Sequence, residues 1–166
     1  DKIMPLIIPS LQAELVGIYE TGKKGNPDPD KVAKRTAQAY FNFVSPAIDA
    51  GGSPFSAMPG KDALEKELIS ILSKANPSSA ITAQKIASAF INCMLTFKTV
   101  WQTVINTNPG ARLFSQDLTD LLSKPQTTST GFAMKFGSAI GNFTGLAIVT
   151  GLIPGSPPVP YTGPLS

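Results

Sequence analysis

Histidine is absent from this chain of 166 residues, and cysteine occurs only once, as Cys93. Without histidine the chain cannot form a Ser-His-Asp or Cys-His nucleophile or a histidine metal site. With one cysteine it can form neither an internal disulfide nor a thiolate zinc site. Cys93 lies on an apolar helical stripe, where we expect it to act as a small core residue. We therefore predict no catalytic residue, no metal site and no cofactor, and we expect a protein that is not an enzyme.

Charged residues are scarce as well, at 15% of the chain, against about 25% in an ordinary soluble domain. None occurs in the 31 residues after Lys135, and the net charge is only +3. The best acidic pair, Asp117 and Asp120, has the i, i+3 spacing that is typical of a solvated helix face. So few charges predict a surface that protein partners cover, and we expect no nucleic-acid partner and no small-molecule substrate.

Three similar helical segments recur at a spacing of 50 residues: RTAQAYFN at 35–42, KIASAFIN at 85–92 and KFGSAIGN at 135–142. In each segment a cation comes first, small residues occupy the third and fifth positions, and an asparagine comes last. Recurrence at one fixed spacing indicates a tandem repeat.

An amphipathic helix precedes each of these segments. LEKELISILSK at 64–74 aligns with FSQDLTDLLSK at 114–124, and LQAELVGIYET at 11–21 aligns at an offset of 53 residues. Apolar residues in the later two recur at i, i+4, i+7 and i+8, which predicts one buried helix face. A single pair of such helices cannot bury both apolar stripes, whereas three stacked pairs can.

The sequence therefore predicts an all-α fold of three tandem helix-pair repeats of about 50 residues, stacked into one domain. We expect units at about 6–58, 59–108 and 109–153, which together form a helical repeat domain at 1–153. Residues 154–166 contain five prolines and no charge. Proline excludes a regular helix there, so we expect an extended C-terminal arm.

The units differ where their second helices end. Pro46 predicts that the second helix of unit one stops near Ser45. In unit two the apolar spacing continues through TFKTVWQTV. This spacing predicts a longer helix, with Phe97, Val100 and Val104 on its apolar face.

Equivalent asparagines, Asn42, Asn92 and Asn142, lie on the polar stripe of the second helices. Asparagine is a poor residue for the middle of a helix, so its recurrence favours one contact with a partner in each unit. The alternative is a solvated face that duplication has copied without any such duty.

Gly137, Gly141 and Gly145 form a GxxxGxxxG stripe that predicts a groove for another helix or for the arm. The same spacing packs helices in membranes, and residues 136–153 are uncharged and just long enough to cross a bilayer. Asn142, the glycines and the alignment with amphipathic helices argue against insertion, so we expect no membrane.

In the arm, Val159, Tyr161 and Leu165 supply apolar side chains. We expect the arm to lie extended on another subunit and to be ordered by that contact. The competing outcome is that it folds back along the groove at Gly137–Gly145 of its own chain.

The charge-poor helical body and the closing segment GLIPGSPPVPYTGPLS resemble small structural proteins of tailed-bacteriophage virions. The resemblance covers the last third of the chain and brings no catalytic or binding signature. It implies a non-enzymatic building block of a capsid, neck, tail or baseplate, which assembles in the host cytoplasm and packs against other virion subunits as a homo- or hetero-oligomer. The alternative is a helical module that holds an apolar ligand or lipid between its helix pairs.

Overall fold

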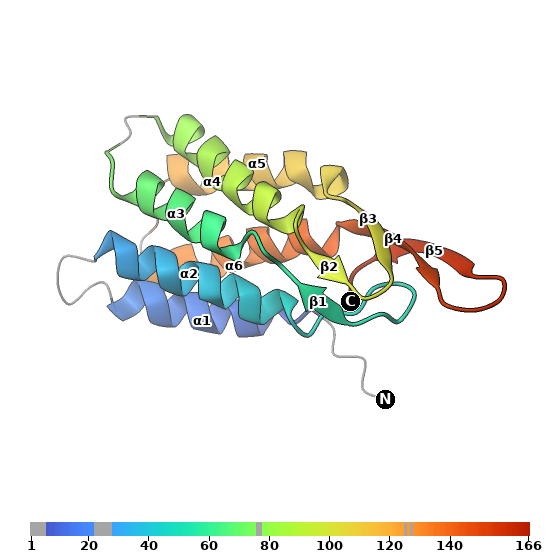
Figure 1. The fold of residues 1–166 in the computed structure, drawn as a ribbon. Coiled ribbons are helices and arrows are strands. Elements are labelled where there is room, and N and C mark those ends of the chain that lie inside the picture. The colour runs from blue at the N-terminus through green and yellow to red at the C-terminus, as the bar shows by residue number, and fades with distance from the viewer. Residues whose placement is uncertain (1–5, 22–27, 76–77, 125, 127) are drawn as a thin grey trace.

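The computed structural model describes residues 6–21, 28–75, 78–124, 126 and 128–166. Within them, six helices and five short strands follow one another in three blocks, each a helix pair followed by strand (Figure 1). The elements are α1 (Ile8–Thr21), α2 (Pro29–Val44), β1 (Phe55–Ala57), α3 (Lys61–Leu72), α4 (Ser79–Met94), β2 (Lys98–Thr99), β3 (Gln102–Asn106), α5 (Asn108–Ser123), α6 (Ser129–Gly145), β4 (Ile148–Ile153) and β5 (Val159–Pro164).

The predicted all-α class is wrong, because β1 pairs with β2 and β3-β4-β5 form a second antiparallel sheet. The expected long helix of unit two ends at Met94, and Val100 and Val104 are 60% exposed instead of facing a core. The segment from Thr99 to Ile105 is rich in β-branched residues, which favour strands. The expectation for unit one holds, since α2 ends at Val44 with Ser45 as its C-cap.

The predicted extended arm is also corrected. Residues 159–164 form β5, which pairs antiparallel with β4 along its whole length, and Leu165 is only 6% exposed. Proline excludes a helix but is compatible with an edge strand. The segment therefore completes the third block as its second strand, instead of forming a free arm.

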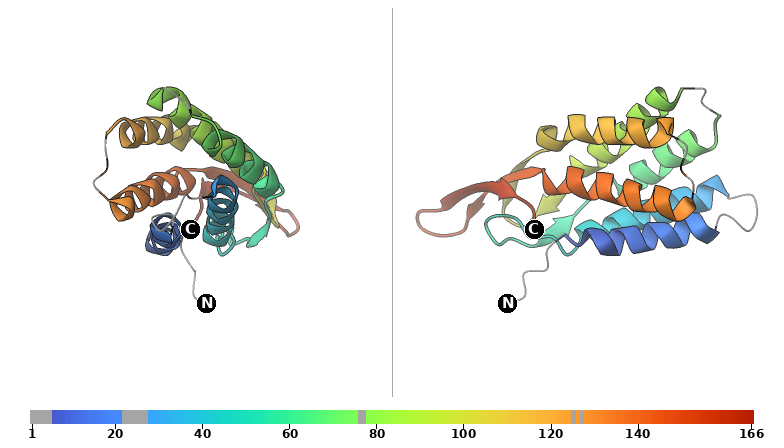
Figure 2. Two further views of the ribbon diagram at one scale, coloured as in Figure 1. Left: turned by 90° about the vertical axis from the view of Figure 1, so that its left-hand side faces the viewer. Right: turned by 180° about the vertical axis from the view of Figure 1, so that it is seen from behind.

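The three helix pairs close into a ring rather than an open stack. Each helix packs against the next along the chain, and α1 packs along α6 to join the first unit to the last (Figure 2). Closure leaves no unit at an exposed end of the repeat, so the array needs none of the polar capping repeats of an open solenoid.

Burial follows the 50-residue register that the sequence predicted. Along the second helices the same positions are buried in every unit, starting at 33, 83 and 133 and ending at 44, 94 and 144. Cys93 is one of these core residues, and burial raises the pKa of its thiol to about 12. The predicted internal repeat thus agrees with the way each unit packs.

The axis of the ring is filled by one large side chain from each unit: Tyr40, Phe90 and Ile140, all at most 1% exposed. The Tyr40 hydroxyl lies 3.0 Å from Thr144 Oγ1 and 3.3 Å from Met94 Sδ. Burial raises the pKa of this tyrosine well above its ordinary value. One phenol therefore touches both of the other units at the centre of the molecule.

Helix starts repeat as regularly as the core. Asp28, Ser78 and Thr128 are spaced by 50 residues, and each side chain caps its helix by accepting a backbone N–H bond. Such caps stabilise a helix end by about 1 kcal/mol.

The glycine stripe on α6 receives α1 of the same chain. A Cβ on Gly137 would lie 2.7 Å from Gln12 Cγ and 3.2 Å from the Gln12 Cα, and one on Gly141 would lie 2.5 Å from a side-chain carbon of Ile8. Gly145 has open space around it. The expected close approach of another helix is therefore made within the ring, at its closing contact.

We predict opposite effects of alanine at two of these glycines. Gly145→Ala should raise the free energy of unfolding by up to about 1 kcal/mol, because alanine favours the helix and meets nothing there. Gly137→Ala should lower it, because the new methyl group pushes against the backbone of α1. Urea denaturation of both variants checks this. An equal gain in both would contradict the packing of α1 on α6.

Candidate functional site

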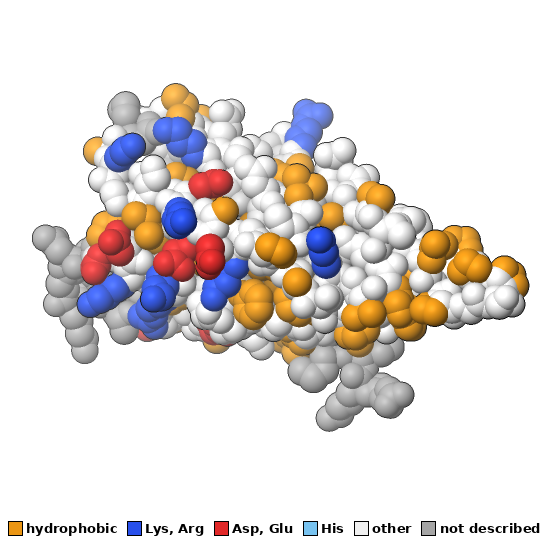
Figure 3. Space-filling model, viewed as in Figure 1, with side chains coloured by type: hydrophobic (Ala, Val, Ile, Leu, Met, Phe, Trp, Pro, Cys, Tyr) orange, Lys and Arg blue, Asp and Glu red, His pale blue; other side chains and the backbone are white. Residues whose placement is uncertain are grey.

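Charge divides the molecule into two ends. The end that carries the strands, which we call the β end, consists of segments 45–59, 95–107 and 146–166 and contains only two charged residues, Asp49 and Lys98. In Figure 3 most charged side chains gather over the opposite end, while the projecting hairpin shows apolar and uncharged side chains. The β end is therefore the face with the least electrostatic cost of being covered.

At the β end, backbone hydrogen bonds join unit one to unit two, unit two to unit three, and unit three to unit one. Unit one gives β1 to β2 of unit two, and unit two gives β3 to β4 of unit three. The circuit closes where Ile48 and Ser166 exchange two backbone hydrogen bonds of 2.8 and 3.0 Å. Ser166 thereby joins the segment between α2 and β1.

A single buried carboxylate, that of Asp49, connects the three units at this end. Its Oδ1 accepts the backbone N–H groups of Gly51 and Ser53 at 3.0 and 2.9 Å. Its Oδ2 accepts the hydroxyl groups of Thr99 from unit two and Tyr161 from unit three. Asp49 is only 3% exposed, so four donors replace the water that a carboxylate normally binds.

Tyr161 reaches Asp49 because the chain provides two glycines beneath its ring. A Cβ on Gly51 would lie 2.6 Å from the ring, and one on Gly151 would lie 2.3 Å from its hydroxyl oxygen. Positions 51, 101 and 151 are equivalent in the repeat, and unit two has Trp101 where the other two units have glycine. Burial and the bond to Asp49 raise the pKa of Tyr161 to about 12.

The outer edge of the hairpin is closed to further strand pairing. Pro160 and Pro164 lie opposite Leu152 and Ile148. Backbone groups of alternate residues in β5 point away from β4, and Pro160, Thr162 and Pro164 are the residues of that set. Proline has no N–H, so Thr162 is the one outward backbone donor of β5. Such prolines are a common protection of edge strands. A partner at this hairpin would therefore contact side chains on its faces, not extend its sheet.

The face that carries Thr150 and Leu152 is uncharged and uncovered by any described helix. Leu152 is 45% exposed, and Val104 on the neighbouring strand is 60% exposed. The hydroxyl groups of Thr150 and Thr162 hydrogen-bond to each other across the strands. The exposed apolar side chains are thus held on a paired sheet rather than on a free arm.

The nine residues predicted to bind partners lie in different surroundings. Of the arm residues, Val159 is 55% exposed, Tyr161 is half-buried and Leu165 is buried. Leu165 borders a surface groove with Gly141, Gly145, Leu6 and the first residue of α1, Ile8. A role of these residues in partner binding stays a prediction, and Val159 is the arm residue best placed for it.

The three asparagines occupy equivalent, exposed positions on their helices. The amide group of Asn42 accepts a bond of 2.9 Å from Gln38 and donates one of 3.3 Å to Glu14. Among the described residues, Asn92 and Asn142 have no side-chain hydrogen bond. The predicted contact of each asparagine with a partner therefore stays a prediction.

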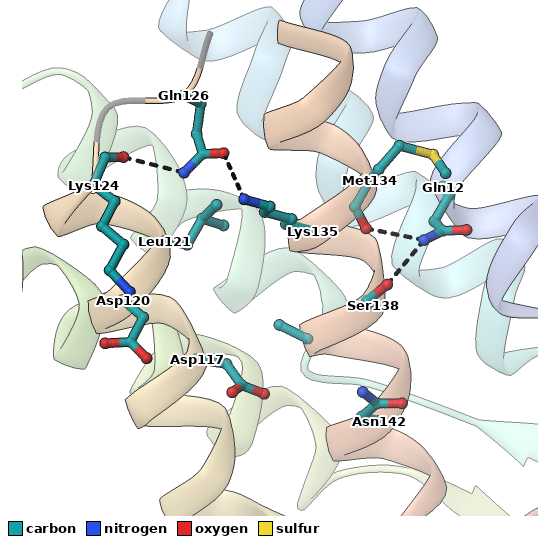
Figure 4. A pocket seen from close by; sticks show the side chains of 11 residues that line it. Gln12, Asp117, Asp120, Leu121, Lys124, Gln126, Met134, Lys135, Ser138 and Asn142 are labelled. Atoms are coloured by element: carbon teal, nitrogen blue, oxygen red, sulfur yellow. Dashed lines mark hydrogen bonds between the residues drawn. The ribbon is translucent and has the colours of Figure 1, made fainter. Parts of the chain in front are cut away.

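Asn142 borders an open groove of about 530 Å³ between α5 and α6 (Figure 4). Asp117 and Asp120 line one wall, and burial and the Asp120 charge raise the pKa of Asp117. Across the groove, Lys135 donates to Gln126 at 3.0 Å. An equivalent groove between α3 and α4, with Glu67 and Lys85, shows that this shape belongs to the repeat.

Asp49 was not recognised from the sequence. It is the one carboxylate in the charge-poor stretch 45–60, separated by Ala50 from the pair Gly51-Gly52, and that isolation was the available signal. Comparing the three units does not reveal Asp49, because the equivalent positions in units two and three hold Thr99 and Val149.

Comparisons with protein-family models, with curated proteins and with solved structures found no match to this chain. Within the part of the chain that the structure describes, no helix is long and apolar enough to cross a membrane. In that same part, acidic and cysteine side chains do not gather in any group of three or more that could hold a metal ion.

We predict that Asp49→Asn lowers the free energy of unfolding by about 3 kcal/mol, because an amide places donors against donors in a buried site. Asp120→Asn, on an exposed helix face, should change it by no more than about 0.5 kcal/mol. Urea denaturation at neutral pH compares the two. Similar small effects would show that the Asp49 network does not hold the units together.

Stability at high pH should depend on Tyr161. Its pKa is about 12 when folded, and about 10 when unfolded. The folded state therefore holds this proton more tightly, and the stabilisation is complete below about pH 10 and lost as the pH rises towards 12. Tyr161→Phe should show a shallower decline over that range in urea titrations. Identical declines in both proteins would exclude this role.

Proposed function

We propose that this chain is a non-enzymatic structural subunit of a phage virion that packs against neighbouring subunits through its β end. The observation that supports this best is the rigid, uncharged hairpin of β4 and β5, which projects from the body and exposes apolar side chains (Figures 1 and 3). The resemblance of the closing segment to virion proteins is the reason for proposing a phage particle. The exposed apolar side chains of the hairpin are the reason for proposing contact through the β end.

The balance of forces at the β end favours assembly over solvation. Covering Val104, Leu152 and Val159 would remove apolar area from water at about 25 cal/mol for each Å². Little is lost in return, because the one acidic group there is already buried and paired. The ordering cost is also low, since paired strands hold the side chains before contact.

The hairpin also limits how subunits associate. A free, flat strand edge would pair with any other strand and lead to uncontrolled aggregation. Pro160 and Pro164 prevent this at β5, so contact depends on the shape of the side-chain surface. Selective contact of this kind is what a subunit with a fixed place in a particle requires.

The decisive experiment asks whether the protein is in the particle. Mass spectrometry of purified particles of the phage that encodes the chain should detect it at a constant ratio to the major capsid protein. If infected cells contain the protein but purified particles lack it, the virion role is refuted.

The contact surface is tested by substitution. Leu152→Lys and Val104→Lys should leave the free energy of unfolding nearly unchanged, because both side chains are exposed, but should reduce incorporation into particles at least about tenfold. Ile81→Lys is the matched control, since Ile81 is 49% exposed at the other end of the molecule. Equal incorporation of all three variants would place the contact elsewhere.

A further inference from the structure

An apolar cavity of about 120 Å³ lies among the helices, between the central aromatic layer and the end opposite the strands. All six helices contribute to its wall, including Tyr19 of α1, Leu68 of α3 and Phe132 of α6. Its lining is almost entirely carbon. No charged residue lines it, so it can accept only a neutral molecule.

One side chain in this wall departs from the repeat. Positions 36, 86 and 136 are equivalent, and units two and three place Ile86 and Phe136 there. Unit one has Thr36, which is smaller and polar although it is only 2% exposed. Its substitution for a large apolar residue leaves room in the cavity.

The Thr36 hydroxyl is a buried polar group with no hydrogen-bond partner among the described residues. Thr82, Thr119 and Thr144, which also lie in helices, each donate to the carbonyl four residues earlier. The Thr36 hydroxyl does not make this hydrogen bond within its helix, so its donor and its acceptor are unpaired in the wall of the cavity. Buried polar groups are nearly always paired, and an exception calls for an unseen partner.

Tyr19 does not satisfy Thr36. Burial raises the pKa of Tyr19, and the neighbouring Thr36 hydroxyl offsets part of this rise. The two groups nevertheless do not meet at hydrogen-bond distance and angle. Apart from Thr82, whose hydroxyl already donates to Ser78, the wall holds only the hydroxyl groups of Thr36 and Tyr19, which is the lower limit of the two to four polar partners that a buried water needs.

From the cavity and its free hydroxyl we infer a binding site for a small neutral molecule, a single ring that carries one hydroxyl group. Thr36 Oγ1 would hydrogen-bond to that group, and the rings of Phe132 and Phe136 would pack against the apolar part. An apolar cavity of about 150 Å³ holds benzene, so the size matches one ring. Lipids and other large ligands need roughly 300–1,000 Å³ and do not fit. This inference does not depend on the virion role.

Phenol and toluene are suitable probes, because they carry a hydroxyl and a methyl group, respectively, on the same ring and are nearly equal in size. Titration calorimetry on the full chain should show phenol binding more tightly than toluene. Thr36→Val should weaken phenol binding about five- to tenfold, the loss expected for one hydrogen bond, and leave toluene binding unchanged or improved. Thr36→Ser, which keeps the hydroxyl, should retain the preference for phenol.

Thr82→Val is the matched control, because Thr82 lines the same cavity but its hydroxyl already donates to Ser78. It should not alter the preference for phenol. The inference is overturned if neither probe binds at millimolar concentration, or if Thr36→Val leaves the preference for phenol intact. An ordered water in the cavity together with absent probe binding would likewise overturn it.

Discussion

The carboxylate of Asp49 is the group on which the closed arrangement of the three units depends. A buried negative charge is tolerated only where donors surround it. Here the donors come from its own turn, from Thr99 of unit two and from Tyr161 of unit three. The carboxylate can therefore be buried only when all three units are in place, which couples the folding of each to the others.

In the central layer of the ring a neutral hydroxyl also joins the three units, through an interaction that is weaker than that of the Asp49 carboxylate. Tyr40 of unit one spans the axis to reach Thr144 of unit three and Met94 of unit two. The second helices remain alike in their buried positions and in the position of the capping residue, which is Asp28, Ser78 or Thr128. The repeat has diverged in the core, at Tyr40, Phe90 and Ile140, and at the β end, where Thr99 and Val149 take the place of Asp49.

The helix pairs and their register could be predicted because they depend on local periodicity. The strands could not, since each is at most six residues long and the apolar spacing of α4 continues through β2 and β3. Phe97 satisfied the helical pattern and is indeed buried, although it lies beyond α4. The candidate site could not be predicted from the sequence for a related reason. Asp49, Thr99 and Tyr161 are brought together by strand pairing between units, which no periodicity within one unit records.

Ring closure also fixes how many copies of the unit the protein can have. An open solenoid gains or loses repeats easily, because each unit contacts only its neighbours. In this chain α1 must pack on α6, and Ile48 must pair with Ser166. A fourth unit would push these surfaces apart, and loss of one unit would leave them without partners. These closing contacts join residues more than 100 positions apart, and contacts between residues so distant in sequence slow the folding of a chain.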